Sequence, residues 1–365
     1  MITELEINNF KSIRHIKMDC KRINVLIGKP NVGKSNILEA MALYAAPYGY
    51  PKRKFLEDYI RYEKLAQLCY FLDRKNQVVV KSNIGFAALR FHMNGINSYD
   101  IILGPDAGIL DKMNQTDSGY SLNDKKVFFE ELINSIEKKP GWISPYYGEI
   151  EEKGNFNSLF SDGSSGYNTP VKKYHFISLP KHHNHFPSFL LPPFGDNLFT
   201  IIEGNRELWD EFAGLFNNYG LDLLLDLEEE KLFVQRKQGR YVTKIPYSLV
   251  ADTLQRYIFH LAAIESNSDS ILIFEEPESH SFPPYISRLA DKIIENKSNQ
   301  YFIATHSPYL LTPFIEKCPA DEIAIFIAGY ENYETKVKAL TDKEIENIME
   351  TGIDLFFNIR AFQEW

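Results

Sequence analysis

Gly28-Lys29-Pro30-Asn31-Val32-Gly33-Lys34-Ser35 is the stretch of sequence from which the fold of this chain can be worked out. It has the form G-x-x-x-x-G-K-S, it follows the apolar residues 23–27, and residues 36–43 after it have helical spacing. A strand, a glycine loop and a helix in this order are typical of a phosphate-binding loop. The glycines let successive backbone N–H groups turn toward a phosphate, and the start of the helix adds its positive dipole end. We therefore expect a nucleotide to be held by Gly28, Pro30, Asn31, Val32, Gly33, Lys34, Ser35 and Asn36.

The last two residues of this loop suit the charged end of a nucleotide. Lys34 can reach the β- and γ-phosphates, and the Ser35 hydroxyl can hold Mg²⁺. A glycine-rich turn with a purely structural role needs no Lys and Ser at its end. The loop therefore predicts a nucleotide with its magnesium ion as the ligand.

Composition narrows the class of protein. The chain has 365 residues, 44% of them hydrophobic, which is enough for one large domain or two. It has no run of 18 apolar residues, and its first six residues lack the pattern of a signal peptide. Cys20, Cys69 and Cys318 are far apart and odd in number, which indicates neither disulfides nor a zinc site. We expect a cytoplasmic protein without a membrane segment. The net charge of −9 argues against a broad DNA-binding surface but leaves room for a local basic patch.

A second group of chemically active residues lies far along the chain, in Ile271-Leu272-Ile273-Phe274-Glu275-Glu276-Pro277-Glu278. Four consecutive apolar residues fit a strand that is buried on both faces of a parallel sheet. The strand ends in carboxylates, where a phosphate site needs a magnesium contact and a base that polarises water. We therefore assign the magnesium position to Glu275 and the general base for the attacking water to Glu276.

Together with the phosphate loop, two further phrases resemble the head domains of the SMC, RecF and OLD-type branch of ABC ATPases. Asn9-Phe10-Lys11-Ser12 has the N-F-K-S form that lies near the nucleotide in these proteins, and residues 275–284 resemble the OLD-type E-P-E-x-H-x-x-P. The next expected strand, residues 300–304, ends at Thr305-His306-Ser307-Pro308. The resemblance implies ATP and Mg²⁺ as cofactors and His306 as the switch histidine that contacts the γ-phosphate. Because only 59 residues follow His306, we expect no Toprim domain of the kind that OLD-type nucleases carry.

Spacing separates this family from other P-loop proteins. Ser35 and Ile271 are 236 residues apart, which exceeds a compact AAA+ or GTPase core and suits an ABC head. Asn296-Lys297-Ser298-Asn299 lacks the Asp of the guanine-reading N-K-x-D, so we expect ATP rather than GTP. The family also places a glutamine near the γ-phosphate, for which Gln67 and Gln77 are both candidates.

The signature segment of ABC heads would fall here within residues 248–256, and this segment contains no glycine. Family members use Ser and glycine amides at this point to contact the γ-phosphate of the opposite subunit. The chain offers instead the N-terminal amides of a helix at Ala251-Asp252-Thr253 and the Thr253 hydroxyl. The resemblance implies a dimer closed across ATP.

The predicted fold class is α/β: an ABC-type head with an antiparallel N-terminal lobe and an inserted middle region. We place the lobe with the phosphate loop at residues 1–97, the inserted helical and loop region at 98–220, and a β meander with the C-terminal lobe at 221–365. Strands are expected at residues 4–7 and 13–18, in a hairpin of 77–81 with 86–92, and in a meander over 221–245. Helices are expected over residues 56–72, 123–138 and 199–219, up to Ile264, and from a capping box at Thr341-Asp342-Lys343-Glu344 to near Gly352. Residues 44–54 and 161–167 are expected to be loops, as is His182-His183-Asn184-His185, since adjacent residues cannot all turn toward one metal ion.

Three functions are compatible with this sequence. The first is an ATP-driven switch that forms a homodimer or higher homo-oligomer and controls a separate nuclease or toxin, as stand-alone prokaryotic relatives do in anti-phage defence. The second is a DNA-maintenance ATPase of the RecF or SMC kind, so nucleic acid stays open as a partner. The third is a scaffold that binds ATP with little turnover. We favour the first.

Overall fold

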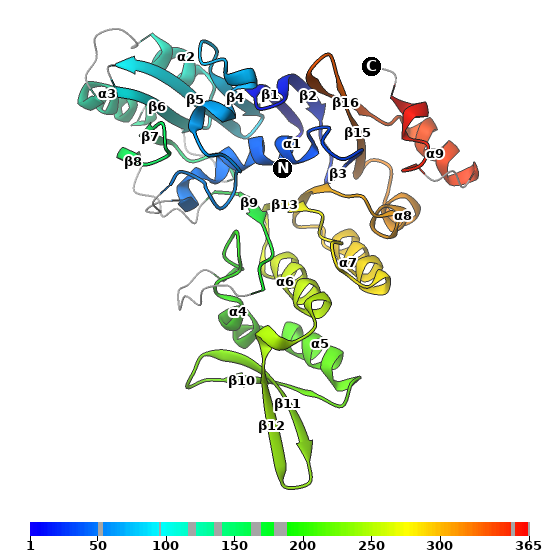
Figure 1. The fold of residues 1–365 in the computed structure, drawn as a ribbon. Helices are drawn as coiled ribbons and strands as arrows, with labels where there is room; N and C mark the ends of the chain where they lie inside the picture. The colour runs from blue at the N-terminus through cyan, green and yellow to red at the C-terminus, as the bar shows by residue number, and fades with distance from the viewer. Residues whose placement is uncertain are drawn as a thin grey trace.

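The computed structural model describes residues 1–49, 54–94, 96–115, 122–134, 141–161, 169–178, 188–351 and 355–363. Three sheets of seven, six and three strands form its framework (Figure 1). Among the described residues, no helix combines the length and the hydrophobicity that crossing a membrane requires. The mixed α/β class that the sequence predicts is confirmed.

The six-stranded sheet carries the phosphate loop. Its strand order is β16-β15-β3-β14-β13-β9, and all neighbouring strands are parallel except the edge strand β16. Every residue of β3 is buried, as expected for a strand inside a parallel sheet. The carboxyl ends of β3, β14 and β13 therefore share one edge, where ligands bind in open α/β sheets. The strands are β3 (Ile23–Gly28), β9 (Val171–Tyr174), β13 (Ile271–Glu275), β14 (Gln300–Ala304), β15 (Ile323–Glu331) and β16 (Glu334–Ala339).

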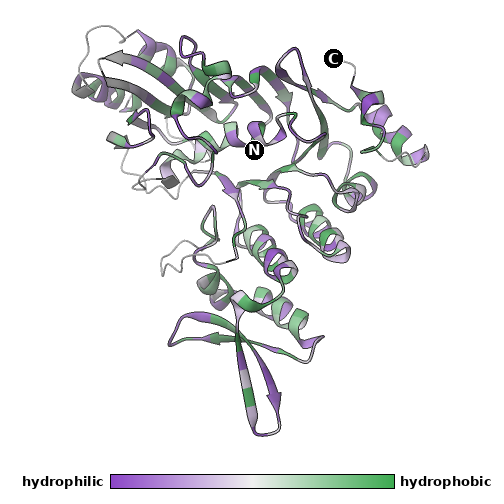
Figure 2. Ribbon diagram, in the orientation of Figure 1, coloured by the Kyte–Doolittle hydropathy of each residue, from purple (hydrophilic) through white to green (hydrophobic). Residues whose placement is uncertain are grey.

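The two faces of this sheet bury separate cores. Ile23, Val25 and Ile27 of β3 belong to the core shared with helices α6, α7 and α8, whereas Leu26 belongs to the core shared with α1 and the antiparallel sheet. Hydrophobic and hydrophilic residues alternate around α6 and α7 (Figure 2), as expected for helices with one buried face. The helices are α1 (Lys34–Met41), α2 (Gly108–Asn114), α3 (Leu122–Asn134), α4 (Leu198–Gly204), α5 (Arg206–Asn217), α6 (Asp252–Ser266), α7 (Pro283–Glu295), α8 (Pro308–Lys317) and α9 (Asp342–Thr351).

The seven-stranded antiparallel sheet has the order β2-β1-β4-β5-β6-β7-β8. The predicted hairpin of residues 77–81 with 86–92 is confirmed as β4 and β5. β6 pairs with β5 along its whole length, so the sheet continues across residues 97 and 98, where the sequence predicts a boundary. The strands are β1 (Glu4–Phe10), β2 (Ile13–Asp19), β4 (Val78–Ser82), β5 (Gly85–Asn94), β6 (Ile96–Gly104), β7 (Tyr146–Glu151) and β8 (Phe156–Ser161).

The predicted meander over residues 221–245 is confirmed as a small sheet with the order β10-β11-β12. β11 and β12 form a hairpin that projects away from the rest of the molecule (Figure 1). The strands are β10 (Asp222–Asp226), β11 (Lys231–Gln238) and β12 (Tyr241–Pro246).

Several local predictions were wrong. Residues 56–72 form turns and two short 3-10 helices, Leu65–Leu68 and Tyr70–Leu72, because their backbone is used by distant segments: the Lys11 amide donates to Leu68 O, and the Leu65 amide donates to Glu152 O. Part of the expected loop at 44–54 belongs to the 3-10 helix Ala42–Gly49, whose apolar residues join the core. The expected helix 199–219 is divided into α4 and α5 at Asn205, whose side chain caps α5.

Other local predictions hold or lie outside the described residues. Helix α3 covers most of 123–138, and the Thr341–Glu344 capping box starts α9, with reciprocal hydrogen bonds of 2.8 and 3.3 Å. The loop predicted at 161–167 begins at the last residue of β8, Ser161, and its residues 162–167 lie outside the described residues. The loop predicted at 182–185 and the helix end at Gly352 also lie outside them.

Candidate nucleotide-binding site

Two glycines of the phosphate loop are required by the backbone around them. Gly33 has a φ of +98°, and a Cβ atom there would lie 2.0 Å from Thr335 Oγ1. Gly28 has a φ of +154°, and its Cβ would lie 2.5 Å from the carbonyl oxygen of Ala328. The loop therefore turns against β15 and β16, which lie far from it in the sequence.

The Lys34 side chain folds back over the loop. Its Nζ donates hydrogen bonds of 2.9 Å to the carbonyl oxygens of both Gly28 and Lys29. The residue is only 6% exposed, and burial lowers the pKa of its ammonium to about 8, although the carboxylates of Glu276, Glu275 and Glu278 oppose the shift. The loop thus already encloses a positive charge.

The N-F-K-S phrase lies beside the loop. Asn36 Nδ2 donates to Ser12 Oγ at 2.7 Å, and Ser12 Oγ and Thr335 Oγ1 share a hydrogen bond of 2.6 Å. Lys11 pairs with Glu39, which is 1% exposed and lies on α1 one turn beyond Ser35. These contacts fix the start of α1 against the turn between β1 and β2.

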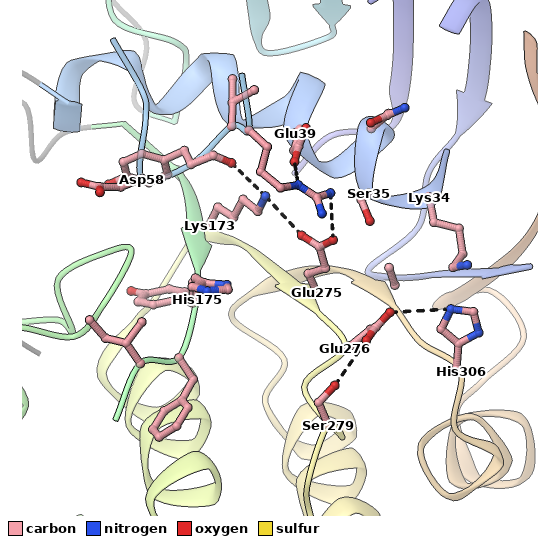
Figure 3. Close-up of a pocket in the computed structure, with 18 of the residues that line it drawn as sticks. Lys34, Ser35, Glu39, Asp58, Lys173, His175, Glu275, Glu276, Ser279 and His306 are labelled. Atoms are coloured by element: carbon pink, nitrogen blue, oxygen red, sulfur yellow. Dashed lines mark hydrogen bonds and ion pairs between the residues drawn. The ribbon is translucent and has the colours of Figure 1, made fainter. Parts of the chain in front are cut away.

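Glu275, at the end of β13, faces the loop across the shared edge of the sheet. Its carboxylate lies 3.5 Å from the Arg61 guanidinium and 3.4 Å from Lys173 Nζ (Figure 3). Burial alone raises the pKa of Glu275, but Lys173, a hydrogen bond from Ser35 and Arg61 together hold it below its usual range. An ionised carboxylate beside the Ser35 hydroxyl suits Mg²⁺, which prefers oxygen ligands.

Glu276 and His306 lie next to each other on neighbouring loops. His306 Nε2 is 3.6 Å from the Glu276 carboxylate, to which the Ser279 hydroxyl donates at 3.3 Å (Figure 3). The Glu276 backbone, with a φ of 47°, is tied by its amide to Ala304 O of β14 at 2.8 Å. Burial and then the Lys34 charge lower the pKa of His306, although the Glu276 carboxylate opposes the shift.

Glu278 links these two loops from behind. Its Oε1 accepts hydrogen bonds of 2.7 Å from the Thr305 hydroxyl and from the His306 backbone amide. Burial raises the pKa of Glu278. The carboxylate therefore connects the segment after β13 directly to the backbone of the predicted switch histidine.

These residues surround one open cavity of about 1000 Å³. The predicted residues that line it are Pro30, Asn31, Val32, Gly33, Lys34, Ser35, Asn36, Glu275, Glu276 and His306. Gly28 lies below it and contributes through its carbonyl group. Neither candidate glutamine is among the lining residues, and Gln67 caps a 3-10 helix instead.

Several charged or titratable residues of the cavity escaped the sequence analysis, among them Glu39, Arg61, Lys173 and His175. Lys173 and His175 come from the end of β9, a four-residue strand too short to show a pattern, and Arg61 lies in the wrongly predicted helix. Glu39 could have been noticed in the sequence, because a charged residue at a buried position of a helix such as α1 suggests a functional or paired group. The parallel pairing of β9 with β13 brings Lys173 to Glu275.

Of the signature-like segment, Arg256 lines this cavity, whereas Thr253 does not. The Thr253 side chain is held elsewhere. Its hydroxyl donates to the carbonyl oxygen of His280 at 2.9 Å, and the residue lines a second, apolar hollow. Within the described residues, no group of three His, Cys, Asp or Glu side chains could hold a metal ion. Ser35 and Glu275 would thus hold Mg²⁺ only together with phosphate oxygens.

Comparisons with known proteins point to an ATPase. Residues 1–174 match the family model described as AAA ATPase domain, and residues 207–312 match the one described as "AAA domain, putative AbiEii toxin, Type IV TA system". A Helicobacter pylori (strain ATCC 700392 / 26695) protein called ATP/GTP phosphatase is 23% identical over an alignment of 334 residues, and the match covers 84% of this chain and 85% of that protein.

Two solved structures share the fold. The SmcHead bound to the C-winged helix domain of ScpA is 17% identical, with a TM-score of 0.50 over 95% of this chain and 99% of that one. The Smc head domain with an extended coiled coil, bound to the C-terminal domain of ScpA derived from Pyrococcus furiosus, is 12% identical, with a TM-score of 0.50 over 96% and 98%. The chain is therefore an ATPase with the fold of an ABC-type, SMC-like head.

Proposed function

We propose that this ATPase is a Mg²⁺-dependent switch that dimerises on ATP and controls a separate effector protein. One observation carries the proposal: a single cavity collects Lys34, Ser35, Glu275, Glu276 and His306. Of the signature-like segment only Arg256, its last residue, lines this cavity, while Thr253 lies outside it. One chain therefore supplies only part of the groups that an ABC-type site uses.

Each side chain in the cavity has a role that follows from its position. Lys34 compensates the charge of the β- and γ-phosphates, and Ser35 with Glu275 holds Mg²⁺. Glu276, which lines the cavity and has a side chain that is 48% exposed, accepts the proton of the attacking water. His306 donates a hydrogen bond to the γ-phosphate, and its backbone is held by Glu278.

A second copy of the chain would complete the site. The α6 helix begins at Asp252 and leaves backbone N–H groups free for a phosphate of the opposite protomer. Because this segment has no glycine, we infer slow turnover and a long-lived dimer. Two such sites related by a two-fold axis bury both γ-phosphates between the protomers.

The effector is inferred from likeness to known proteins. One matched family description names a toxin of a toxin–antitoxin system, and one solved SMC head carries a partner protein domain. These likenesses support a role in prokaryotic defence, with a nuclease or toxin as the controlled protein. A nuclease or toxin gene beside this one would identify the effector.

Glu276→Gln tests the switch. The amide keeps the hydrogen bonding of the carboxylate but cannot take a proton, so ATP should stay bound and hold two protomers together. Light scattering should show a dimer of this variant with Mg·ATP, and a smaller dimer fraction for Lys34→Ala with Glu276→Gln under the same conditions. A monomer with and without Mg·ATP at micromolar concentration would contradict the ATP-closed dimer.

A further inference from the structure

The hairpin of β11 and β12 carries an unusual concentration of positive charge. Residues 231–246 contain five cations and no acidic residue, in a chain whose net charge is −9. Without these five cations the chain would carry −14. The cations are Lys231, Arg236, Lys237, Arg240 and Lys244.

Most of this charge is not neutralised within the protein. Lys231 pairs with Glu229 at 3.0 Å, and Lys244 pairs with Asp226 at 3.1 Å. Arg236, Lys237 and Arg240 have no ion pair with any carboxylate of the described residues; Arg240 contacts the Tyr241 ring instead, 5.3 Å from its centroid. Three cations are thus available to an external anion.

The residues at the tip of the hairpin are exposed to solvent. All nine residues from Arg236 to Lys244 are exposed, including Tyr241 at 66% and Val242 at 52%. The hairpin projects from the body (Figure 1), and the part of β11 near its turn is hydrophilic (Figure 2). This tip adds nothing to a hydrophobic core, so its length needs another explanation.

Cations occupy both faces of the ribbon. The register pairs Arg236 with Thr243 and Lys237 with Val242, and successive residues of a strand point to opposite faces. Arg236 therefore lies on one face, and Lys237 lies on the other with Lys244. A partner with one flat anionic surface would contact only one face of the ribbon, whereas the two walls of an anionic groove would contact both faces at once.

We propose that this hairpin binds duplex DNA by entering the major groove. That groove is about 12 Å wide and 8.5 Å deep and admits a two-stranded β-ribbon, and phosphates line both of its walls. Each exposed arm has about four residues, so the tip reaches about 13 Å at about 3.3 Å per residue. Strands about 4.8 Å apart leave room for side chains on both sides. The deep, narrow groove of duplex RNA does not admit this ribbon.

The inference is independent of the proposed switch, because the hairpin shares no residue with the nucleotide cavity. Three unpaired cations give about three phosphate contacts, so the logarithm of the affinity should fall with the logarithm of salt with a slope of about −2.7. Raising salt from about 50 to about 200 mM should then weaken binding about 40-fold.

The test uses the full chain without nucleotide and a fluorescein-labelled DNA duplex of about 30 base pairs in an anisotropy titration. The variant Arg236→Gln/Lys237→Gln/Arg240→Gln should lose about 2.7 units of the salt slope. The matched control, Lys17→Gln/Lys297→Gln/Lys317→Gln, removes three exposed lysines elsewhere and should bind like wild type. Both variants should keep the wild-type ATP turnover and melting temperature.

Three results would overturn the proposal. The hairpin variant and the control could bind DNA equally, or the salt slope of the hairpin variant could equal that of wild type. The charges would then serve only to keep an exposed sheet edge from pairing with other chains. Polyglutamate could compete as well as duplex DNA does, which would point to an acidic protein as the partner. Duplex RNA binding as tightly as DNA would exclude insertion into the major groove.

Discussion

Glu278→Ala is the sharpest test of how the switch histidine is held. The substitution leaves the Thr305 hydroxyl and the His306 amide without the oxygen that accepts both hydrogen bonds at 2.7 Å. A hydrogen bond to a charged acceptor contributes about 1.5–3 kcal/mol, so the two together are worth about 3–6 kcal/mol. Burying the carboxylate offsets part of this, and we expect a net loss of about 2–3 kcal/mol in the free energy of unfolding.

The loss translates into a measurable melting temperature. At about 2.1 cal/mol/K per residue, a chain of 365 residues that melts as one unit has an unfolding entropy of about 0.8 kcal/mol/K. Scanning calorimetry at pH 7 should therefore place Glu278→Ala about 3 °C below wild type. Since the His306 backbone also loses its anchor, ATP turnover should fall about 100-fold, the usual effect of a misplacement near 1 Å.

Glu278→Gln is the matched control, because its amide oxygen still accepts both hydrogen bonds. It should keep most of the turnover. Burial raises the pKa of Glu278 above 4.5, so the folded wild type binds this proton more tightly than the unfolded chain. The stability from this proton is present below pH 4.5 and is lost as the pH rises through the raised pKa. The melting temperature of Glu278→Gln should therefore rise relative to wild type between pH 4 and pH 7.

Equal melting and equal turnover of Glu278→Ala and wild type would refute the reasoning. A loss of stability with unchanged turnover would leave Glu278 as a support of the fold without influence on His306.

Three further predictions concern the cavity itself. Lys34→Ala should abolish ATP binding in calorimetry. In wild type, burial lowers the Lys34 pKa to about 8, and the phosphates need the charged form of this side chain. ATP affinity should therefore be flat below pH 7 and fall up to about tenfold per pH unit above pH 8, and calorimetry in buffers of different ionisation enthalpy should show proton uptake on binding. Glu276→Gln should slow hydrolysis by about two to four powers of ten while ATP stays bound; if Glu275→Gln abolished turnover and Glu276→Gln did not, the two roles would be reversed. Gly33→Ala should lower the free energy of unfolding in urea by at least about 2 kcal/mol, because a Cβ atom there would lie 2.0 Å from Thr335 Oγ1 on a backbone with positive φ. A stability equal to wild type would mean that the loop can turn another way.

Short, local patterns were enough to predict much of the site. The spacing of glycine, lysine and serine in residues 28–35 specifies a loop because the backbone conformation and the charge are set within eight residues. The apolar run before Glu275 identifies a buried strand in the same way. That both lie at one edge follows from parallel pairing, since all carboxyl ends of a parallel sheet point in one direction.

Contacts between distant segments were beyond the reach of these patterns. Arg61, Lys173 and Glu39 come from a turn, an edge strand and a helix, and only the packing of two sheets brings them together with Glu275. The residues around 56–72 have a helical pattern of apolar positions, but their amides and carbonyls bond to β1 and to the turn after β7 instead. Hydrogen bonds to distant backbone outweighed local helix propensity there.

The local sequence thus determines the phosphate-binding loop, whereas the charge network around Glu275 forms only in the folded molecule. A phosphate loop works through neighbouring residues, whose geometry depends on few torsion angles. The network around Glu275 depends on the burial and mutual distance of groups more than 200 residues apart, as between Arg61 and Glu275. Burial and distance set the energies of charges, and both exist only once the sheets have packed.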